Sequence, residues 1–297
     1  VIIFLLKKIF EIQHMAISTS QKLLHLQKRK EQLDREICGL KEKNMLMLAS
    51  ALTTIGELEN IDMNVLCVPG VQNSDLTDHM LEVCKLRGDA IAIIDLEGDY
   101  LYPYEANNNG KDLKPVNSST IVETLKGRVI DNSYGAAYFP AVFVPSEGIF
   151  MPASVAALGA LGGTEGRQAL WFAPAGFDRG SLAFVQLTSV RVNQGDRNAL
   201  FDANINPIVK FPGENYVFFS QNTLQQAASA LESINVKRMV LEVKRQIVEI
   251  GNRILFEQNT PQLRARFVNE ASIVLAGVQL RQGVEKFLVI CDQRNNT

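Results

Sequence analysis

Two short apolar runs, separated by a stretch of helical periodicity, constrain the fold of this chain more than any other feature. Residues 64–68 and 90–94 are apolar runs of strand length, and Pro69-Gly70 ends the first of them. Between the two runs, residues 75–86 carry apolar side chains at helical spacing. A strand, a helix and a strand in this order predict a βαβ unit with a parallel pair of strands. We therefore expect a mixed α/β fold in which helices flank a sheet of mixed strand direction.

Segments after residue 119 extend this pattern. A strand is expected over 137–144, and its internal Pro140 places it at a sheet edge or a bulge, because proline has no N–H to donate. Pro212-Gly213 predicts a tight turn between two apolar runs, and Gly162-Gly163 is expected to end an Ala-rich helix. The other expected elements are helices over 120–125, 151–161, 236–254 and 261–282, and strands over 208–211, 216–219 and 287–291.

The helix expected over 236–254 has the clearest periodicity in the chain. Its apolar residues recur at steps of three and four and form one stripe, which we expect to pack on the sheet. The stripe consists of Val236, Met239, Val240, Val243, Ile247, Ile250 and Ile254. The other face is charged, and we expect it to point outward into solvent. It carries Lys237, Arg238, Glu242, Lys244, Arg245, Glu249 and Arg253.

Residues 1–60 are expected to form a mainly helical segment in front of an α/β core over 61–297. Apolar residues between positions 23 and 40 alternate with side chains of both charges, which is typical of a surface helix or a short coiled coil. A solvated amphipathic helix is favoured over a partner-docking helix, because charge runs usually face water. The six apolar residues at the start are too few to span a membrane, and their charges lie on the wrong side for a signal peptide. Since no Met begins the chain, we expect a fragment or a processed product.

The composition excludes several classes of protein. The 30 basic and 32 acidic residues give a formal net charge of −2, whereas general nucleic-acid binding relies on many cations to neutralise phosphates. The four cysteines are scattered and the three histidines are far apart, so neither a disulfide scaffold nor a zinc site is expected. We expect no cofactor and no bound metal.

Motifs of catalysis are absent from the sequence. It contains neither a Gly-x-Gly-x-x-Gly loop nor a Walker phosphate loop nor a Gly-x-Ser-x-Gly turn. Asp95, Glu97 and Asp99 follow the second apolar run, where ligands bind in open α/β sheets, and they could hold a divalent cation. A solvated acidic turn is favoured, and an enzyme with a carboxylate site near Asp95 stays open as the alternative. The single tryptophan, Trp171, is expected to be a buried packing anchor.

A series of uncommon stretches occurs in a fixed order over residues 61–297. They are Asp131–Pro140, Pro152–Ala160, Trp171–Ala175, Ala203–Ile208 with Phe211–Gly213, Thr223-Leu224, Asn235–Arg238, Phe256–Pro261, and Cys291-Asp292 with Asn295-Asn296. Each is weak alone, but together and in this order the chain resembles the contractile phage tail sheath protein family. Residues 156–160 depart from that family's Ala-Gly-x-x-Ala pattern, which indicates a divergent member.

The resemblance implies a mechanical function with no active site. Subunits of this kind polymerise as a helical sleeve around a tail tube, and the sleeve shortens when the baseplate triggers it, driving the tube through the host envelope. The implied partners are further copies of the subunit, the tail tube protein, and baseplate and tail terminator proteins, without nucleic acid or membrane insertion. The implied location is the virion tail, assembled in the host cytoplasm. The sheath of a related contractile injection system, such as a secretion system or tailocin, is the alternative within this class.

The resemblance also bears on assembly. Family members carry terminal arms that add strands to a neighbour's sheet, and neither arm is identified here, so we expect this piece to be an inactive monomer. The family places the C-terminal region on the inner side of the sheath, near the tube. The tentative tube-facing residues are therefore Lys237, Arg238, Lys244, Arg245 and Arg253. An ordinary solvated face is the alternative, because exposed charges individually contribute little.

Overall fold

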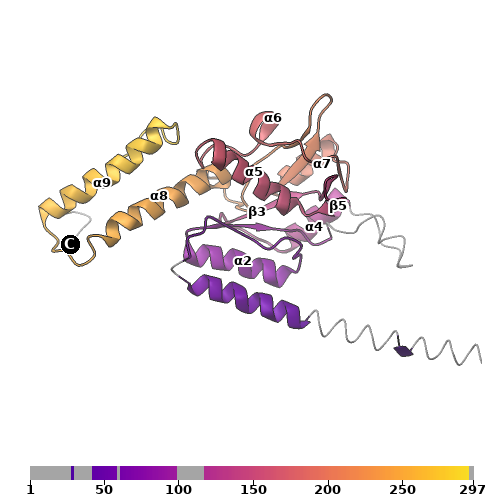
Figure 1. The fold of residues 1–297 in the computed structure, drawn as a ribbon, viewed down its shortest axis with the longest axis horizontal. Helices are drawn as coiled ribbons and strands as arrows, with labels where there is room; N and C mark the ends of the chain where they lie inside the picture. The colour runs from indigo at the N-terminus through magenta and orange to yellow at the C-terminus, as the bar shows by residue number, and fades with distance from the viewer. Residues whose placement is uncertain (1–27, 30–41, 59–60, 99–116, 294–297) are drawn as a thin grey trace, which may run out of the picture. The chain divides into compact units, whose positions relative to one another are not determined.

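A computed structural model of the protein describes residues 28–29, 42–58, 61–98 and 117–293 (Figure 1). The chain divides into two units, residues 1–51 and 52–297. In the first unit, residues 42–51 are helical, and the second unit begins with helical residues 52–57. The expected N-terminal helical character is thus confirmed for the part described, and the other residues of 1–60 lie outside the described residues. The boundary expected at residue 60 stays a prediction.

A six-stranded mixed sheet forms the centre of the second unit, with the strand order β1-β2-β3-β8-β9-β6. The first four strands are parallel, and the last two are antiparallel to their neighbours. The expected βαβ unit is confirmed, because helix α2 (Ser74–Arg87) connects the parallel neighbours β1 and β2. The strands are β1 (Val65–Cys67), β2 (Ile91–Ile94), β3 (Gly135–Phe139), β8 (Ile205–Lys210), β9 (Tyr216–Phe218) and β6 (Ser181–Leu182).

Pro140 separates two strands that the sequence predicted as one. Strand β3 ends at Phe139 with neighbours on both sides, so it is a central strand and not an edge strand. Strand β4 (Val142–Val144) begins a second, three-stranded sheet with β5 (Ile149–Met151) and β7 (Leu187–Thr188). The proline therefore ends pairing in the first sheet and allows the chain to enter the second, consistent with its missing N–H donor.

Helices cover both faces of the large sheet. Ile91 and Ile93 of β2 pack in a cluster with the Ala-rich face of α5 (Ala153–Arg167). On the other face, Gly135 of β3 meets Leu81 of α2. The remaining helices are α4 (Ser118–Gly127), α6 (Gly176–Arg179), α7 (Gln194–Phe201), the 3-10 turn η1 (Ala230–Glu232), α8 (Ile234–Asn252) and α9 (Pro261–Leu280). None of the helices in the described part is long and apolar enough to cross a membrane.

Two predicted details of the elements are wrong, and one is confirmed. Helix α5 continues through Gly162-Gly163 to Arg167, since its apolar face still packs at that point and Thr164 is buried. Residues 287–291 form no strand, and no strand of the described residues pairs with them. The helix expected to begin at residue 261 does begin there: Pro261 is the first residue of α9, and the Thr260 hydroxyl caps it by accepting the N–H of Leu263.

Candidate functional site

Helix α8 carries four of the five basic residues that the sequence proposed as a tube-facing surface, and the fifth, Arg253, is its C-cap residue. Ile234, Lys237, Arg238 and Leu241 follow each other at helical steps of three and one, and all four are buried. The apolar stripe that contains Val243 and Ile250 lies on the opposite side. Helix α8 has its main contacts with α9, its antiparallel neighbour (Figure 1), and with η1, and not with strands of the sheet. The expectation that the stripe packs on the sheet is therefore wrong.

Lys237 is a buried cation that lies against uncharged groups. Its Nζ donates a hydrogen bond to Ser133 Oγ at 2.9 Å and lies 3.1 Å from the centre of the Tyr134 ring. No carboxylate forms an ion pair with it among the described residues. Burial, and secondarily the positive charge of Lys244, lower the pKa of Lys237 to about 8. The ring face provides a cation–π contact, which offsets only part of the lost hydration.

Arg238 is buried next to Lys237 and is only partly paired. Its Nη2 contacts Glu165 Oε2 of α5 at 2.9 Å, and the amide of Asn64 also reaches the Glu165 carboxylate. Its Nε and Nη1 atoms are buried and have no hydrogen-bond partner among the described residues. Burial lowers the pKa of Arg238, although the Glu165 carboxylate opposes the shift. An unpaired buried donor costs about 1–3 kcal/mol, so this face of α8 is not optimised for stability.

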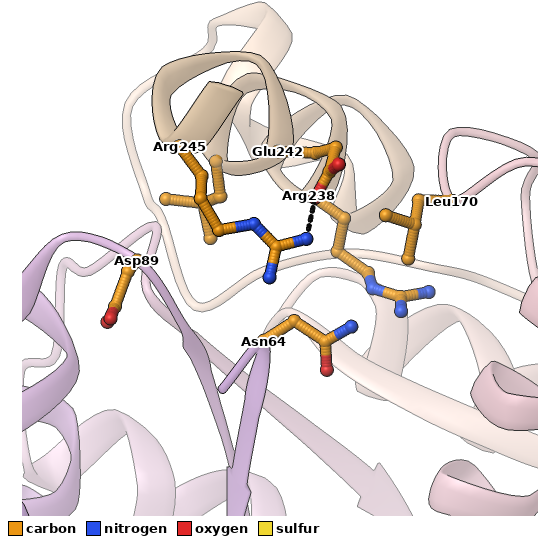
Figure 2. A pocket seen from close by; sticks show the side chains of 7 residues that line it. Asn64, Asp89, Leu170, Arg238, Glu242 and Arg245 are labelled. Carbon is orange, nitrogen blue, oxygen red and sulfur yellow. Dashed lines mark hydrogen bonds and ion pairs between the residues drawn. The ribbon is translucent and has the colours of Figure 1, made fainter. Parts of the chain in front are cut away.

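A small hollow lies beside Arg238, between α8 and the β1 edge of the sheet (Figure 2). Its volume of about 10 Å³ is close to the space that one water molecule occupies. Figure 2 shows Arg238, Arg245 and Asn64 around it, with Glu242 bonded to Arg245. The hollow is too small for an organic ligand, which needs several hundred Å³.

Farther along α8, two more cations fasten the helix to the end of α2 and the residues before β1. Lys244 Nζ donates to the carbonyl oxygen of Gly88 at 3.0 Å, and Arg245 contacts Asp62 at 2.5 Å. Gly88 is the left-handed cap of α2, and a Cβ there would lie 2.6 Å from Lys244 Nζ. The glycine thus serves two needs, the positive φ of the cap and the close approach of the lysine.

The five basic residues proposed from the sequence therefore do not form one exposed face. Lys237 and Arg238 are each only 3% exposed, so the expectation that they point outward is wrong. Their long alkyl stems pack under α8 while the charged heads reach polar groups of the sheet body. Lys244 and Arg253 remain exposed, and Arg245 is partly exposed beside its ion-pair partners.

The carboxylate cluster near Asp95 has a structural explanation. Asp95 is buried, and its carboxylate accepts hydrogen bonds from the Gly70 N–H at 2.8 Å and the Ser154 hydroxyl at 2.9 Å. The Ser154 N–H also donates to it at 3.3 Å, so Asp95 satisfies the start of helix α5. Glu97 is exposed, and Asp99 lies outside the described residues. Within the described part, no group of three His, Cys, Asp or Glu side chains could hold a metal ion.

Several of the motifs noted in the sequence meet at the base of α8. Tyr134, from the first motif, contacts Lys237, and the carbonyl oxygen of Trp171 accepts a hydrogen bond from Asn235 at 3.1 Å. The order of these motifs along the chain indicated the family resemblance, but it did not predict which motifs contact each other in the fold. Sequence reasoning missed Glu165 altogether, because a single carboxylate in a glycine-containing helix has no distinguishing pattern.

Comparison with known proteins adds independent information. No family model matches the chain. A tail sheath protein of Vibrio phage KVP40 is 37% identical over 126 residues, which is 42% of this chain and 19% of that protein. A tail sheath protein of Enterobacteria phage T4 is 32% identical over 127 residues, 43% of this chain and 19% of that protein. The matched part thus spans about a fifth of each of these relatives.

A solved structure shares the fold. The helical sheath of the anti-feeding prophage in its contracted state aligns with a TM-score of 0.56 at 22% sequence identity. The alignment covers 80% of this chain and 59% of that chain. At this identity the likeness is one of fold, and it extends over far more of the chain than the sequence matches do.

Proposed function

The chain belongs to the phage tail sheath protein family, a structural and non-enzymatic family, and from this premise we propose that it acts as a subunit of a contractile tail sheath. The observation that supports this function most is the 37% identity to a phage tail sheath protein over 126 residues. In this function the subunit polymerises as a helical sleeve around a tail tube in the virion tail. The sleeve then shortens and drives the tube through the host envelope.

The physical basis of such a sleeve is an interface between two different patches of the subunit. A head-to-tail contact of this kind builds an open helical array, and two discrete packings of nearly rigid subunits allow contraction. Exchanged arms would tether neighbours by adding strands, and β1 and β6 are the edge strands of the six-stranded sheet. Main-chain hydrogen bonds at such an edge survive a change of side-chain packing between the two states.

We further propose that exposed cations of α8 face an acidic surface of the tube. Of the five basic residues first considered, Lys244 and Arg253 are exposed, and Arg245 is partly so. Lys237 and Arg238 are left out of this surface because they are buried in the subunit. Charge pairs of this type favour registry and fast docking, and they release readily, which suits a tube that the sheath must leave.

The test is assembly of the full-length protein with its tube protein, observed by electron microscopy. The proposal predicts extended helical sheaths on tubes for the parent. Arg253→Glu with Lys244→Glu should retain the fold but give fewer extended sheaths and more empty polymers. Lys85→Glu with Lys126→Glu, exposed cations on α2 and α4, is the matched control and should assemble normally. Normal assembly of the α8 variant at low and physiological salt would assign that face to solvent.

The sheath of a related contractile injection system has the same physical basis. The fold shared with the anti-feeding prophage sheath is compatible with this alternative. The genes adjacent to this one distinguish the two, since a phage supplies capsid and genome-packaging genes and an injection system supplies a cargo instead.

A further inference from the structure

The contacts that hold α8 on the sheet body are of two distinct kinds, one at its base and one along its shaft. The base, around residues 234 and 235, is held by uncharged hydrogen bonds. The Ile234 N–H donates to the Gln221 carbonyl oxygen at 2.8 Å, and the side chains of Gln221 and Asn235 bond at 2.8 Å. These groups are matched donor to acceptor, so the base is a firmly fixed point.

The shaft of α8, from Lys237 to Val248, is held by four cations. Arg238 and Arg245 reach carboxylates outside the helix, on Glu165 and Asp62, but the two lysines reach only neutral acceptors. Lys237 and Lys244 donate to a hydroxyl and to a backbone carbonyl, and Arg238 leaves two donor atoms unpaired. Removing such charges from water costs more than these neutral acceptors return. The contact between the shaft and the sheet body therefore carries a desolvation penalty.

Packing beneath the shaft is also incomplete. An open groove of about 640 Å³ runs between α8 and the end of α2, lined by residues that include Ile61, Leu86, Gly88, Lys244 and Val248. Leu86 and Val248 are 86% and 49% exposed across this groove. A close-packed interface would leave no space of that size. In contrast, α8 and α9 are in contact, and Ile250 of α8 and Val278 of α9 are buried.

We propose that the α8–α9 hairpin is a hinged lever, which pivots at the base of α8 and lifts its cationic shaft off the sheet body as one unit. Release rehydrates Lys237 and Arg238. The end of α9 is bonded to Trp171, which also accepts from Asn235 at the base of α8, so this attachment lies at the pivot. The desolvated charges of Lys237 and Arg238 thus destabilise the docked position. The lever can therefore change position without local unfolding. The inference concerns the isolated chain and does not depend on the proposed function.

The protonation of Lys237 should change the position of this lever, so the lever can be tested by varying the pH. The pKa of Lys237 is about 8 when α8 is docked, below the ordinary value of 10.5. Lys237 therefore binds a proton more tightly once the shaft is released. Docking should therefore strengthen as the pH rises from 8 toward 10.5 and should be weakest below 8. The charged and titratable groups around it are Lys244 and Arg238 on α8, Tyr134 before β3, Glu165 on α5, and Arg87 and Asp89 at the end of α2.

Distance measurement between two spin labels tests the lever. Leu86→Cys and Val248→Cys place labels on opposite walls of the groove, in a chain with Cys38→Ser and Cys291→Ser, and buried Cys84 and partly buried Cys67 are retained. The parent should give a short and a long distance at pH 7. The long population should fall at least about tenfold at pH 10 and, at pH 7, in Lys237→Met.

Controls keep the result interpretable. Lys85→Met removes an exposed lysine of α2 and should leave both distances unchanged. Lys237→Gln is the second variant if Lys237→Met does not fold, and it should also reduce the long population because it carries no charge. A single short distance in the parent at pH 7 would overturn the proposal. So would a long population that grows, or stays the same, when the charge of Lys237 is removed.

Discussion

The indole Nε1–H of Trp171 donates a hydrogen bond to the carbonyl oxygen of Arg281 at 2.9 Å, and the Arg281 guanidinium lies 4.8 Å from the centre of the same ring. Two segments 110 positions apart are joined by this contact, one after α5 and one at the end of α9. The buried anchor expected from the single tryptophan is confirmed. Its partner was beyond sequence reasoning, because a backbone carbonyl leaves no signature in the residue types.

Replacing the anchor should weaken the attachment of α9. Trp171→Phe removes the N–H donor and part of the ring, so the free energy of unfolding should fall by about 1–3 kcal/mol, measured by chemical denaturation. Arg281→Ala is the matched control, since it keeps the backbone carbonyl. It loses the cation–π contact and a long, exposed hydrogen bond from Nε to the Gly277 carbonyl oxygen at 3.4 Å, together about 1 kcal/mol or less. Equal losses in the two variants would show that the indole hydrogen bond contributes nothing.

Asp95→Asn should be destabilising although the two side chains have nearly the same shape. The carboxylate accepts from the Gly70 N–H, the Ser154 N–H and the Ser154 hydroxyl, and an amide would direct its own N–H donors at some of them. We expect a loss of about 2 kcal/mol in a thermal or denaturant melt. Glu97→Gln, two positions on and exposed, should stay within about 0.5 kcal/mol of the parent. A larger effect at Glu97 would revive the idea of a functional carboxylate site.

Two neighbouring positions on α8 test which face meets α9. Ile250 is 6% exposed on the apolar stripe, so Ile250→Asp buries an unpaired carboxylate and should cost about 3 kcal/mol or more. Val248 is 49% exposed on another face, so Val248→Asp should cost less than about 1 kcal/mol. The measurement is the melting temperature of each variant, and we expect the lower one for Ile250→Asp. A lower melting temperature for Val248→Asp would show that the face of α8 carrying Val248, and not the one carrying Ile250, is buried.

The same helix shows where prediction from sequence succeeded and where it failed. Periodicity located α8 and its stripe because apolar residues at helical spacing must be buried somewhere. It misplaced Lys237 and Arg238, since the rule that charges face water ignores the reach of long alkyl stems to partners such as Ser133 and Glu165. Those partners lie 104 and 73 residues away, so no local pattern could reveal them.

The sheet shows the same division between local and distant information. The βαβ unit was predictable because β1, α2 and β2 are consecutive and short connections favour neighbours in space. The strand order beyond it was not, since residues 140–204 separate β3 from its neighbour β8 along the chain. Pro140 was expected to mark an edge strand or a bulge, whereas β3 is a central strand and the chain leaves one sheet at this proline and enters another.

The last prediction concerns Gly135, which begins β3 directly after Tyr134. A Cβ at this position would lie 2.2 Å from Leu81 Cδ2 and 3.0 Å from Leu224 Cδ1. Both leucines are buried, so neither can move aside without displacing α2 or the residues that cover β3. Gly135→Ala should therefore lower the free energy of unfolding by about 1–3 kcal/mol, measured by denaturant titration.

Gly127→Ala is the matched control, because an added Cβ there meets nothing within 4 Å and the residue lies at the end of α4. That variant should be neutral or more stable by up to about 1 kcal/mol. A third variant separates steric overlap from other effects of the methyl group. Leu81→Ala alone creates a cavity, and Gly135→Ala added to it should cost much less than it does in the parent, since the clashing Cδ2 is gone. If the two losses simply add, overlap with Leu81 is not the reason that position 135 requires glycine.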